Sequence, residues 1–190
     1  MAQVRPTGWS RAQRLLHWSI AALVLLAAPM GLYMVSLPFR QLLLKFLLYQ
    51  LHKSIGIAAF LLALGQLVLH WRRGRPDWDA ALPGWQRQAA AAVHALLFAL
   101  LVATPVLGYL TAATAPARIP TLFLGVIPMP HLVGTDPAWF AVLRRVHLGA
   151  AVLLVLLAVG HALMALHHHR RGDGTLRRMW RGGPRSAAAP

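Results

Sequence analysis

Four long apolar stretches, separated by short polar segments, dominate the chain. Each is long enough to cross a bilayer, which takes about 20 mainly apolar residues. Leu and Ala dominate them, and no alternation of polar and apolar positions favours strands, so the pattern predicts helices. The predicted spans cover about residues 15–35, 46–71, 89–113 and 139–166. We expect an all-α membrane protein, a four-transmembrane-helix bundle within residues 1–171, followed by a basic disordered tail at 172–190.

The first apolar stretch has a second interpretation as a secretory signal peptide, because Arg5, Arg11 and Arg14 precede it. However, the stretch is longer than a usual signal core, it contains His17 and Ser19, and no small-residue cleavage site follows convincingly. We therefore interpret it as a retained membrane span.

Composition supports a membrane protein. Hydrophobic residues make up 58% of the chain and charged residues 12%, whereas typical soluble domains have about 45–50% and about 25%. The net charge of +15 would suit a nucleic-acid-binding protein, but the basic residues lie in short clusters between the apolar stretches. We expect contacts with membrane lipid and none with nucleic acid.

The absence of cysteine narrows the cofactor chemistry. It excludes disulfides, thiolate metal sites, iron–sulfur clusters and the covalent attachment of c-type haem. A bound metal must therefore rely on His, Met or the few Asp residues.

The distribution of Lys and Arg predicts the orientation, because these residues are enriched in cytoplasmic loops. With the N-terminus inside, thirteen basic residues lie on the cytoplasmic side and six on the outer side. We therefore predict that both termini are cytoplasmic. The loop of residues 114–137 then faces outward, and its five prolines predict an irregular conformation.

Histidines are the strongest functional signal, because ionisable side chains inside a membrane span are costly and usually mark a site. Of the ten histidines, those in or at the edge of the predicted helices are His17, His52, His70, His94, His147 and His161. His147 and His161 are 14 residues apart, just under four helical turns, so both project from nearly the same face. They are separated by about 21 Å along the axis.

The helix directions predict which histidines share a depth. The first span begins inside, which puts His17 level with His161, and the second begins outside, which puts His52 level with His147. Two facing imidazoles form a bis-histidine axial clamp for haem iron. Without cysteine the haem is non-covalent, and so b-type, and two filled axial positions suit electron transfer.

Other interpretations of the histidines remain open at this stage. A single intramembrane histidine can be a hydrogen-bonded helix contact, and zinc would want four ligands in a tetrahedron. His94 lies at inner depth and could replace His17 as a ligand, or hydrogen-bond a haem propionate or a quinone. We interpret His70 as interfacial, His131 as a loop residue, and 167–169 as a solvated helix end near lipid headgroups.

Small residues near these histidines suit cofactor packing, because glycine lets a flat macrocycle approach the backbone. Gly56 lies one turn after His52, and Gly149 follows His147 by two residues. We predict that both glycines contact a cofactor.

The ordered set of residues resembles the bacterial cytochrome b561 family over nearly the whole chain. Its marks are Arg-x-x-Arg-Leu-Leu before His17-Trp18, His52 with Gly56, His94 with Pro105 and Gly108, and the His147/His161 pair. The resemblance implies a two-haem protein of the bacterial inner membrane that exchanges electrons with quinone. It also implies His17, His52, His147 and His161 as the ligands of two b-type haems, in agreement with the depth argument.

The resemblance is compatible with more than one function. One member type resembles superoxide:ubiquinone oxidoreductase, which oxidises superoxide outside and reduces ubiquinone, whereas other relatives pass electrons between quinone and a partner dehydrogenase or hydrogenase. Three outer basic residues favour the first, because Lys53 adjoins His52, and Arg144 and Arg145 precede His147. A cationic funnel would steer a small anion such as superoxide. These charges could equally neutralise haem propionates or anchor helix ends.

We therefore expect a membrane haem oxidoreductase of the superoxide:quinone type. The first alternative is a cytochrome b subunit that docks a redox partner. The second is a non-redox membrane protein whose histidines only join helices.

Overall fold

The computed structural model describes residues 8–76 and 82–182, which form helices and one small hairpin. The four long helices are α1 (Arg11–Ser36), α2 (Leu42–Arg73), α3 (Gly84–Thr114) and α4 (Pro137–Arg170). A single 3₁₀ turn, η1 (Phe39–Gln41), leads into α2. All four long helices are long and apolar enough to cross a membrane, and each contains one of the four predicted spans. The prediction of four apolar spanning helices is confirmed.

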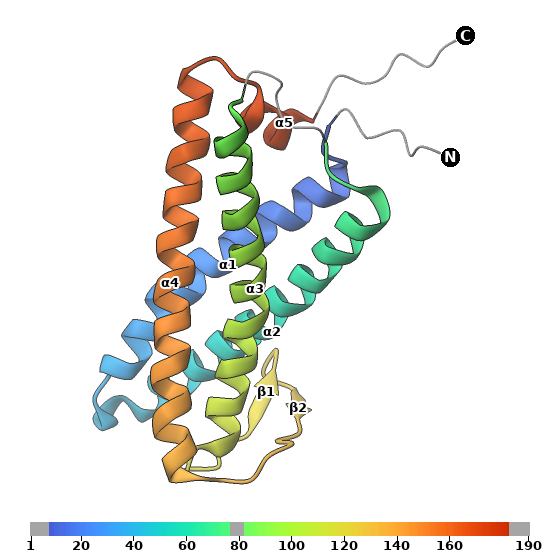
Figure 1. The fold of residues 1–190 in the computed structure, drawn as a ribbon. Helices are drawn as coiled ribbons and strands as arrows, with labels where there is room; N and C mark the ends of the chain where they lie inside the picture. The colour runs from blue at the N-terminus through green and yellow to red at the C-terminus, as the bar shows by residue number, and fades with distance from the viewer. Residues whose placement is uncertain (1–7, 77–81, 183–190) are drawn as a thin grey trace.

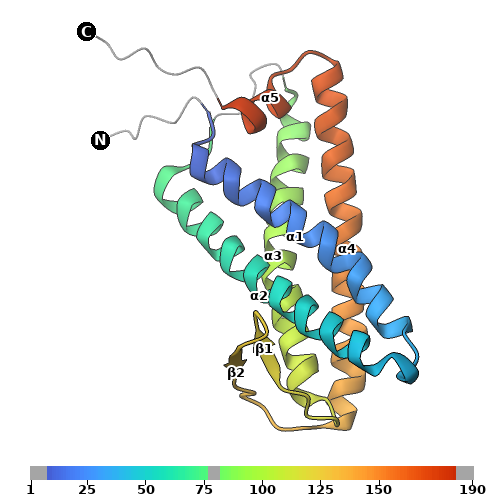
Figure 2. The same ribbon diagram turned by 180° about the vertical axis from the view of Figure 1, so that it is seen from behind.

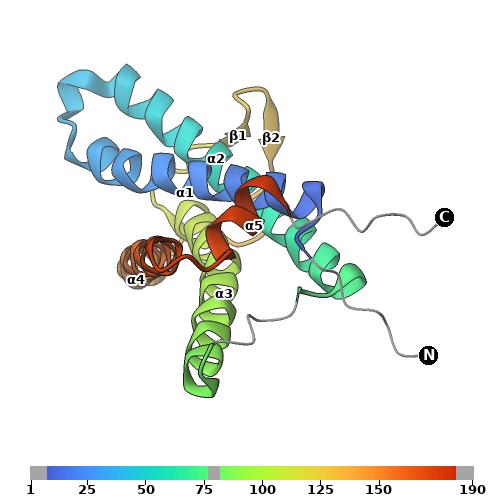
Figure 3. The ribbon, with the colours of Figure 1, turned by 90° about the horizontal axis from the view of Figure 1, so that it is seen from above.

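The long helices form two antiparallel pairs. α1 packs along α2, α3 packs along α4, and α2 joins the pairs by packing against α3. The α1–α2 pair runs obliquely to the α3–α4 pair (Figures 1 and 2). The view from above shows α4 and α3 on one side and α1 and α2 on the other (Figure 3).

The molecule has two distinct ends. One end holds the α1–α2 connection and the hairpin, and we call it the hairpin end (Figure 1). The opposite end holds the start of α1, the end of α4 and a short helix, α5 (Thr175–Arg181), and we call it the α5 end.

Polar side chains cap the N-termini of α1 and α4. Ser10 accepts a hydrogen bond from the backbone of Gln13, and the Gln13 side chain accepts one from the backbone of Ser10, which makes a capping box. Asp136 accepts hydrogen bonds from the backbone of Ala138 and Trp139, and Pro137 follows it at the first helical position. These contacts satisfy amide groups that a helix start otherwise leaves unpaired.

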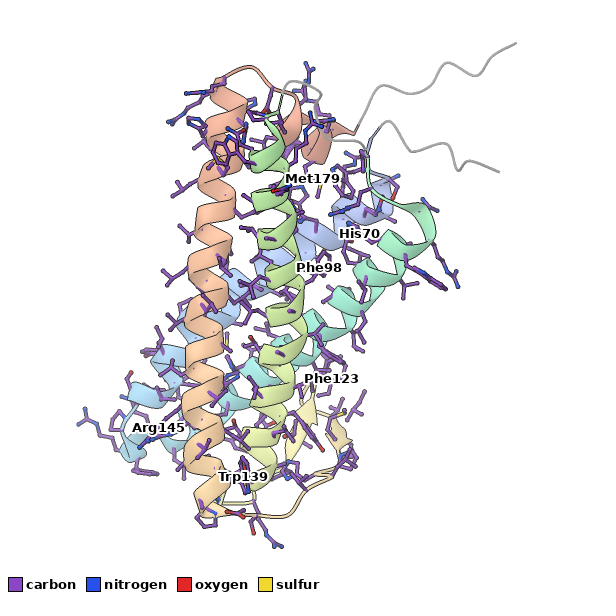
Figure 4. All side chains as sticks on the ribbon, viewed as in Figure 1. His70, Phe98, Phe123, Trp139, Arg145 and Met179 are labelled. Carbon is purple, nitrogen blue, oxygen red and sulfur yellow. The ribbon has the colours of Figure 1, made fainter. Side chains whose placement is uncertain are left out.

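The prediction of a disordered tail from residue 172 is wrong for residues 175–181, which form α5. The reason is tertiary, because α1 side chains bond the carbonyl groups at the end of this helix. Arg14 donates to the Trp180 carbonyl at 2.6 Å, and Trp18 Nε1 donates to the Met179 carbonyl at 3.2 Å. The rings of Trp18 and Trp180 also meet edge to face, 5.1 Å between centroids. Figure 4 labels Met179 at this end of the molecule, and the predicted disorder of 183–190 lies outside the described residues.

The expectation of an irregular loop at residues 114–137 is also corrected. This segment contains an antiparallel hairpin of β1 (Thr121–Phe123) and β2 (Ile127–Met129). A hairpin this small is not stable alone. Here it lies on α2, whose side chains bond the backbone of β1 and of the residues beside it.

The four long helices expose many large apolar side chains on the surface of the molecule, as expected of helices that face lipid. Leu25 on α1, Leu61 on α2 and Leu156 on α4 each expose more than half of their surface. Exposed apolar area on this scale is uncommon on soluble monomers. It fits a protein whose outer solvent is the hydrocarbon layer of a membrane.

Candidate functional site

α4 carries two of the candidate ligands, one toward each end of the molecule. Their spacing of 14 residues puts His147 and His161 on nearly the same face, about 21 Å apart along the axis. Each meets one of the histidines that the depth argument paired with it. The ring centroids of His52 and His147 are 6.3 Å apart, and those of His17 and His161 are 6.2 Å apart. Both predicted pairs are therefore neighbours in the folded chain.

These separations match two imidazoles that share one metal ion. With metal–nitrogen bonds of about 2.0–2.1 Å, rings on opposite sides of an ion have centroids about 6.3–6.5 Å apart, within about 0.1 Å of the separations found here. A direct hydrogen bond between ring nitrogens would bring the two centroids to about 5.2 Å. Each pair thus has the centroid separation expected of two imidazoles that share one ion.

At the hairpin end, backbone carbonyls orient both imidazoles. His52 Nδ1 lies 3.1 Å from the Ala27 carbonyl oxygen on α1, and His147 Nδ1 lies 3.0 Å from the Thr104 carbonyl oxygen on α3. A carbonyl only accepts, so Nδ1 carries the proton and Nε2 keeps its lone pair for a metal. The Thr104 hydroxyl is buried and finds no hydrogen-bond partner among the described residues.

At the α5 end a third imidazole joins the pair. The ring centroid of His94 on α3 lies 5.1 Å from that of His161. This separation is about 1 Å too short for an ion between the rings, whereas the 6.2 Å between His17 and His161 fits. The geometry therefore favours His17 over His94 as the partner of His161 at a metal.

Zinc is a poor alternative at either pair. Among residues 8–76 and 82–182, no group of three or more His, Cys, Asp or Glu side chains has the geometry to hold a metal ion. A structural zinc ion takes four such ligands, whereas haem needs only two axial ligands because the porphyrin supplies the other four.

The remaining histidines have other neighbours. His70 donates to the Gln66 carbonyl at 3.0 Å, and its ring contacts the rings of Trp9 and Phe98 at 5.3 and 5.4 Å. Figure 4 shows His70 and Phe98 in the α5 half of the molecule. His168 Nδ1 lies 2.7 Å from a carboxylate oxygen of Asp173, so it fixes the turn between α4 and α5.

His131 lies in the segment between the hairpin and α4. Its Nε2 is 3.3 Å from the Thr121 hydroxyl, and its ring contacts that of Tyr109. Burial lowers the pKa of His131, and the positive charge of Lys53 lowers it further. The ring therefore stays neutral over a wider pH range than a free histidine.

Two glycines that the sequence reasoning did not assign to the site contact the hairpin-end imidazoles. A Cβ atom at Gly31 would lie 3.0 Å from Cε1 of His52, and one at Gly108 would lie 3.0 Å from Cε1 of His147. Beside Gly56 and Gly149, an added Cβ would meet none of the described residues within 4 Å. That space is compatible with a cofactor, so the predicted role of Gly56 and Gly149 stays a prediction.

The three predicted steering residues do not occupy equivalent positions. Lys53 is half-buried beside the hairpin, and its ammonium lies 3.5 Å from the Pro120 carbonyl oxygen. Arg144 and Arg145 are exposed near the start of α4. Figure 4 places Arg145 at the hairpin end of α4. The two arginine side chains are thus more exposed than the lysine side chain.

Comparison with known proteins identifies relatives of the chain. The chain matches the family model described as prokaryotic cytochrome b561 over residues 8–182. It is 34% identical to cytochrome b561 homolog 2 of Escherichia coli (strain K12), an alignment that covers 86% of each chain. It is 30% identical to cytochrome b561 homolog 1 of the same organism, over 70% of this chain and 74% of that protein.

Proposed function

Because the chain belongs to the prokaryotic cytochrome b561 family, a family of multi-pass membrane electron carriers, we propose that it holds two b-type haems and oxidises superoxide with quinone as acceptor. His52 and His147 would hold the haem at the hairpin end, and His17 and His161 the haem at the α5 end. The observation that carries this assignment is the pair of centroid separations, 6.3 and 6.2 Å. When bound, each haem would supply a one-electron redox centre.

The proposed orientation puts the hairpin end outside and the α5 end in the cytoplasm. The excess of Lys and Arg on the α5 side supports it. α1 begins and α4 ends at that same end, together with α5, so a single orientation of the bundle satisfies the whole charge pattern (Figure 1).

The proposed reaction removes one electron from each of two superoxide anions, which leave as dioxygen. Ubiquinone takes up the two electrons and two protons and leaves as ubiquinol. Exposed Arg144 and Arg145 stand three and two residues before His147, where they would attract a small anion to the hairpin end. Lys53, half-buried beside His52, would add to the positive potential there.

We assign His94 to hydrogen bonding near the α5 end and not to metal ligation, because its ring lies too close to that of His161. An imidazole at this depth can donate a hydrogen bond to a quinone or a haem propionate, or pass a proton. Substitution separates the two roles. His94→Ala should keep both haems, whereas His17→Ala should lose the α5-end haem.

Haem quantification and a reduced-minus-oxidised absorption spectrum test the cofactor assignment. His52→Ala and His147→Ala should each lose the same haem, and His17→Ala and His161→Ala should each lose the other. Colourless purified protein, one porphyrin per chain, or two retained haems in His147→Ala would contradict the pairing.

Superoxide-dependent reduction of ubiquinone by the isolated chain tests the substrate. Quinol formation that superoxide dismutase abolishes supports the proposal. If the protein holds both haems but superoxide reduces no quinone, the alternative is favoured, namely an electron-transfer subunit that links the quinone pool to a partner dehydrogenase or hydrogenase.

A further inference from the structure

The two histidines at the hairpin end are held in equivalent ways by different helices. His52 meets the carbonyl of Ala27 on α1, and a glycine, Gly31, lies four residues later on that helix. His147 meets the carbonyl of Thr104 on α3, and Gly108 also lies four residues later. Each histidine thus docks onto the first helix of its own antiparallel pair, over a carbonyl and a glycine with the same offset.

Helix geometry explains the offset of four. In an α-helix the carbonyl of residue i points at the amide of residue i+4, so a ring that donates to this carbonyl must lie over residue i+4. A side chain there would occupy the same space as the ring. The structure shows this at both places, because an added Cβ would come within 3.0 Å of Cε1, whereas ordinary contact begins at 3.4 Å.

The pair at the α5 end lacks this arrangement. Within residues 8–76 and 82–182, neither His17 nor His161 donates a hydrogen bond to a backbone carbonyl, and none of the glycines approaches either ring. The planes of the two rings also differ between the pairs, at 89° for His52 and His147 and 68° for His17 and His161.

We propose that Gly31 and Gly108 are positioning residues that fix the plane and the Nδ1–H tautomer of the two hairpin-end imidazoles. This inference rests on the proposed role of His52 and His147 as axial ligands. Each glycine acts through its histidine, because the missing Cβ lets the Nδ1–Cε1 edge of the ring come close enough for Nδ1–H to reach the carbonyl. The hydrogen bond from Nδ1 raises the basicity of a ligating imidazole, so it favours the oxidised iron.

Alanine at either glycine should therefore tilt one ring and weaken its hydrogen bond to the carbonyl. We expect Gly31→Ala and Gly108→Ala each to raise the midpoint potential of the hairpin-end haem and to change the low-field g value of its electron paramagnetic resonance spectrum. Changes of this outer-shell kind also weaken metal retention by about 10- to 100-fold. The signals of the α5-end haem should not change.

Gly65→Ala is the matched control, because Gly65 is an interior glycine of α2 and its added Cβ would lie at an ordinary 3.8 Å from Leu16. It should keep the wild-type spectrum and both potentials. If Gly31→Ala and Gly108→Ala also keep them, the inference is wrong and the haem assignment is untouched. If the wild-type protein holds no haem pair, the proposed function fails first.

A double substitution tests the contact without any haem signal. Once the ring of His52 is removed, a methyl group at position 31 no longer makes the close contact with Cε1 of that ring. In the His52→Ala background, Gly31→Ala should therefore leave the thermal unfolding temperature unchanged or raise it, because alanine favours a helix over glycine. A lower unfolding temperature in that background would overturn the inference, even if Gly31→Ala alone fails to accumulate.

Discussion

Gln50 on α2 forms hydrogen bonds to the hairpin segment beside those of Ser54, and its removal should loosen the hairpin. Its amide nitrogen donates to the Pro120 carbonyl at 2.8 Å, and its amide oxygen accepts from the Leu122 amide at 2.9 Å. The side chain is buried, with 6% of its surface exposed. Gln50→Leu keeps the volume of the side chain and removes both hydrogen bonds.

The expected cost follows from the two backbone groups that lose their partner. A buried group left unpaired costs about 1–3 kcal/mol, and the partial burial at Leu122 favours the lower half of that range. The docked hairpin should therefore be destabilised by about 2–4 kcal/mol, which is roughly a 30- to 900-fold change in its opening equilibrium.

Hydrogen–deuterium exchange in detergent or nanodiscs measures this opening directly. The amide of Leu122 should exchange faster by that factor in Gln50→Leu, while the amides of α3 and α4 keep their protection. Gln88→Leu, at an exposed position on α3, is the control and should leave Leu122 unchanged. Unchanged exchange at Leu122 in Gln50→Leu would refute the argument that this side chain holds the hairpin.

Three further predictions concern α5, the exposed arginines at positions 144 and 145, and the dependence of stability on pH. Trp18→Leu removes the hydrogen bond to Met179 and the ring contact with Trp180 but keeps the Arg14 hydrogen bond, and it should lower thermal stability by about 1–3 kcal/mol, with α5 becoming sensitive to protease. Arg144→Gln with Arg145→Gln should slow superoxide-driven quinone reduction at low salt and flatten its dependence on ionic strength. Because burial lowers the pKa of His131, the unfolded chain binds more protons below about pH 6.5, so stability should fall as the pH drops through that value. His131→Asn should remove this part of the pH dependence in chemical denaturation curves.

The long helices and the histidine pairing could be predicted because both depend on short-range regularities. Twenty consecutive apolar residues identify a span without any knowledge of its neighbours. The pairing of His52 with His147 needed only the alternating direction of successive spans and the rise of 1.5 Å per residue. Both quantities are set by the membrane and the helix, and not by the details of packing.

The hairpin, α5 and the positioning glycines could not be predicted because they depend on contacts between distant residues. The strands of the hairpin have three residues each and form where Gln50 supplies partners, about 70 residues earlier in the chain. α5 is a basic heptapeptide held by Trp18 from the first helix. Gly108 is one of the marks of the family resemblance, but its contact with the ring of His147 depends on the packing of α4 against α3.

α4 contributes to both candidate sites, and this has a mechanical consequence. Its hydrogen-bonded backbone fixes the distance between His147 and His161, whereas α1 and α2 supply one partner each from opposite ends of their pair. A slip of α4 by one turn, about 5.4 Å, would separate both histidine pairs at once. The docking of His147 on the Thr104 carbonyl opposes such a slip, because it ties α4 to α3 at one height. The same contact that orients His147 therefore also sets the register of α4, the helix that carries His161.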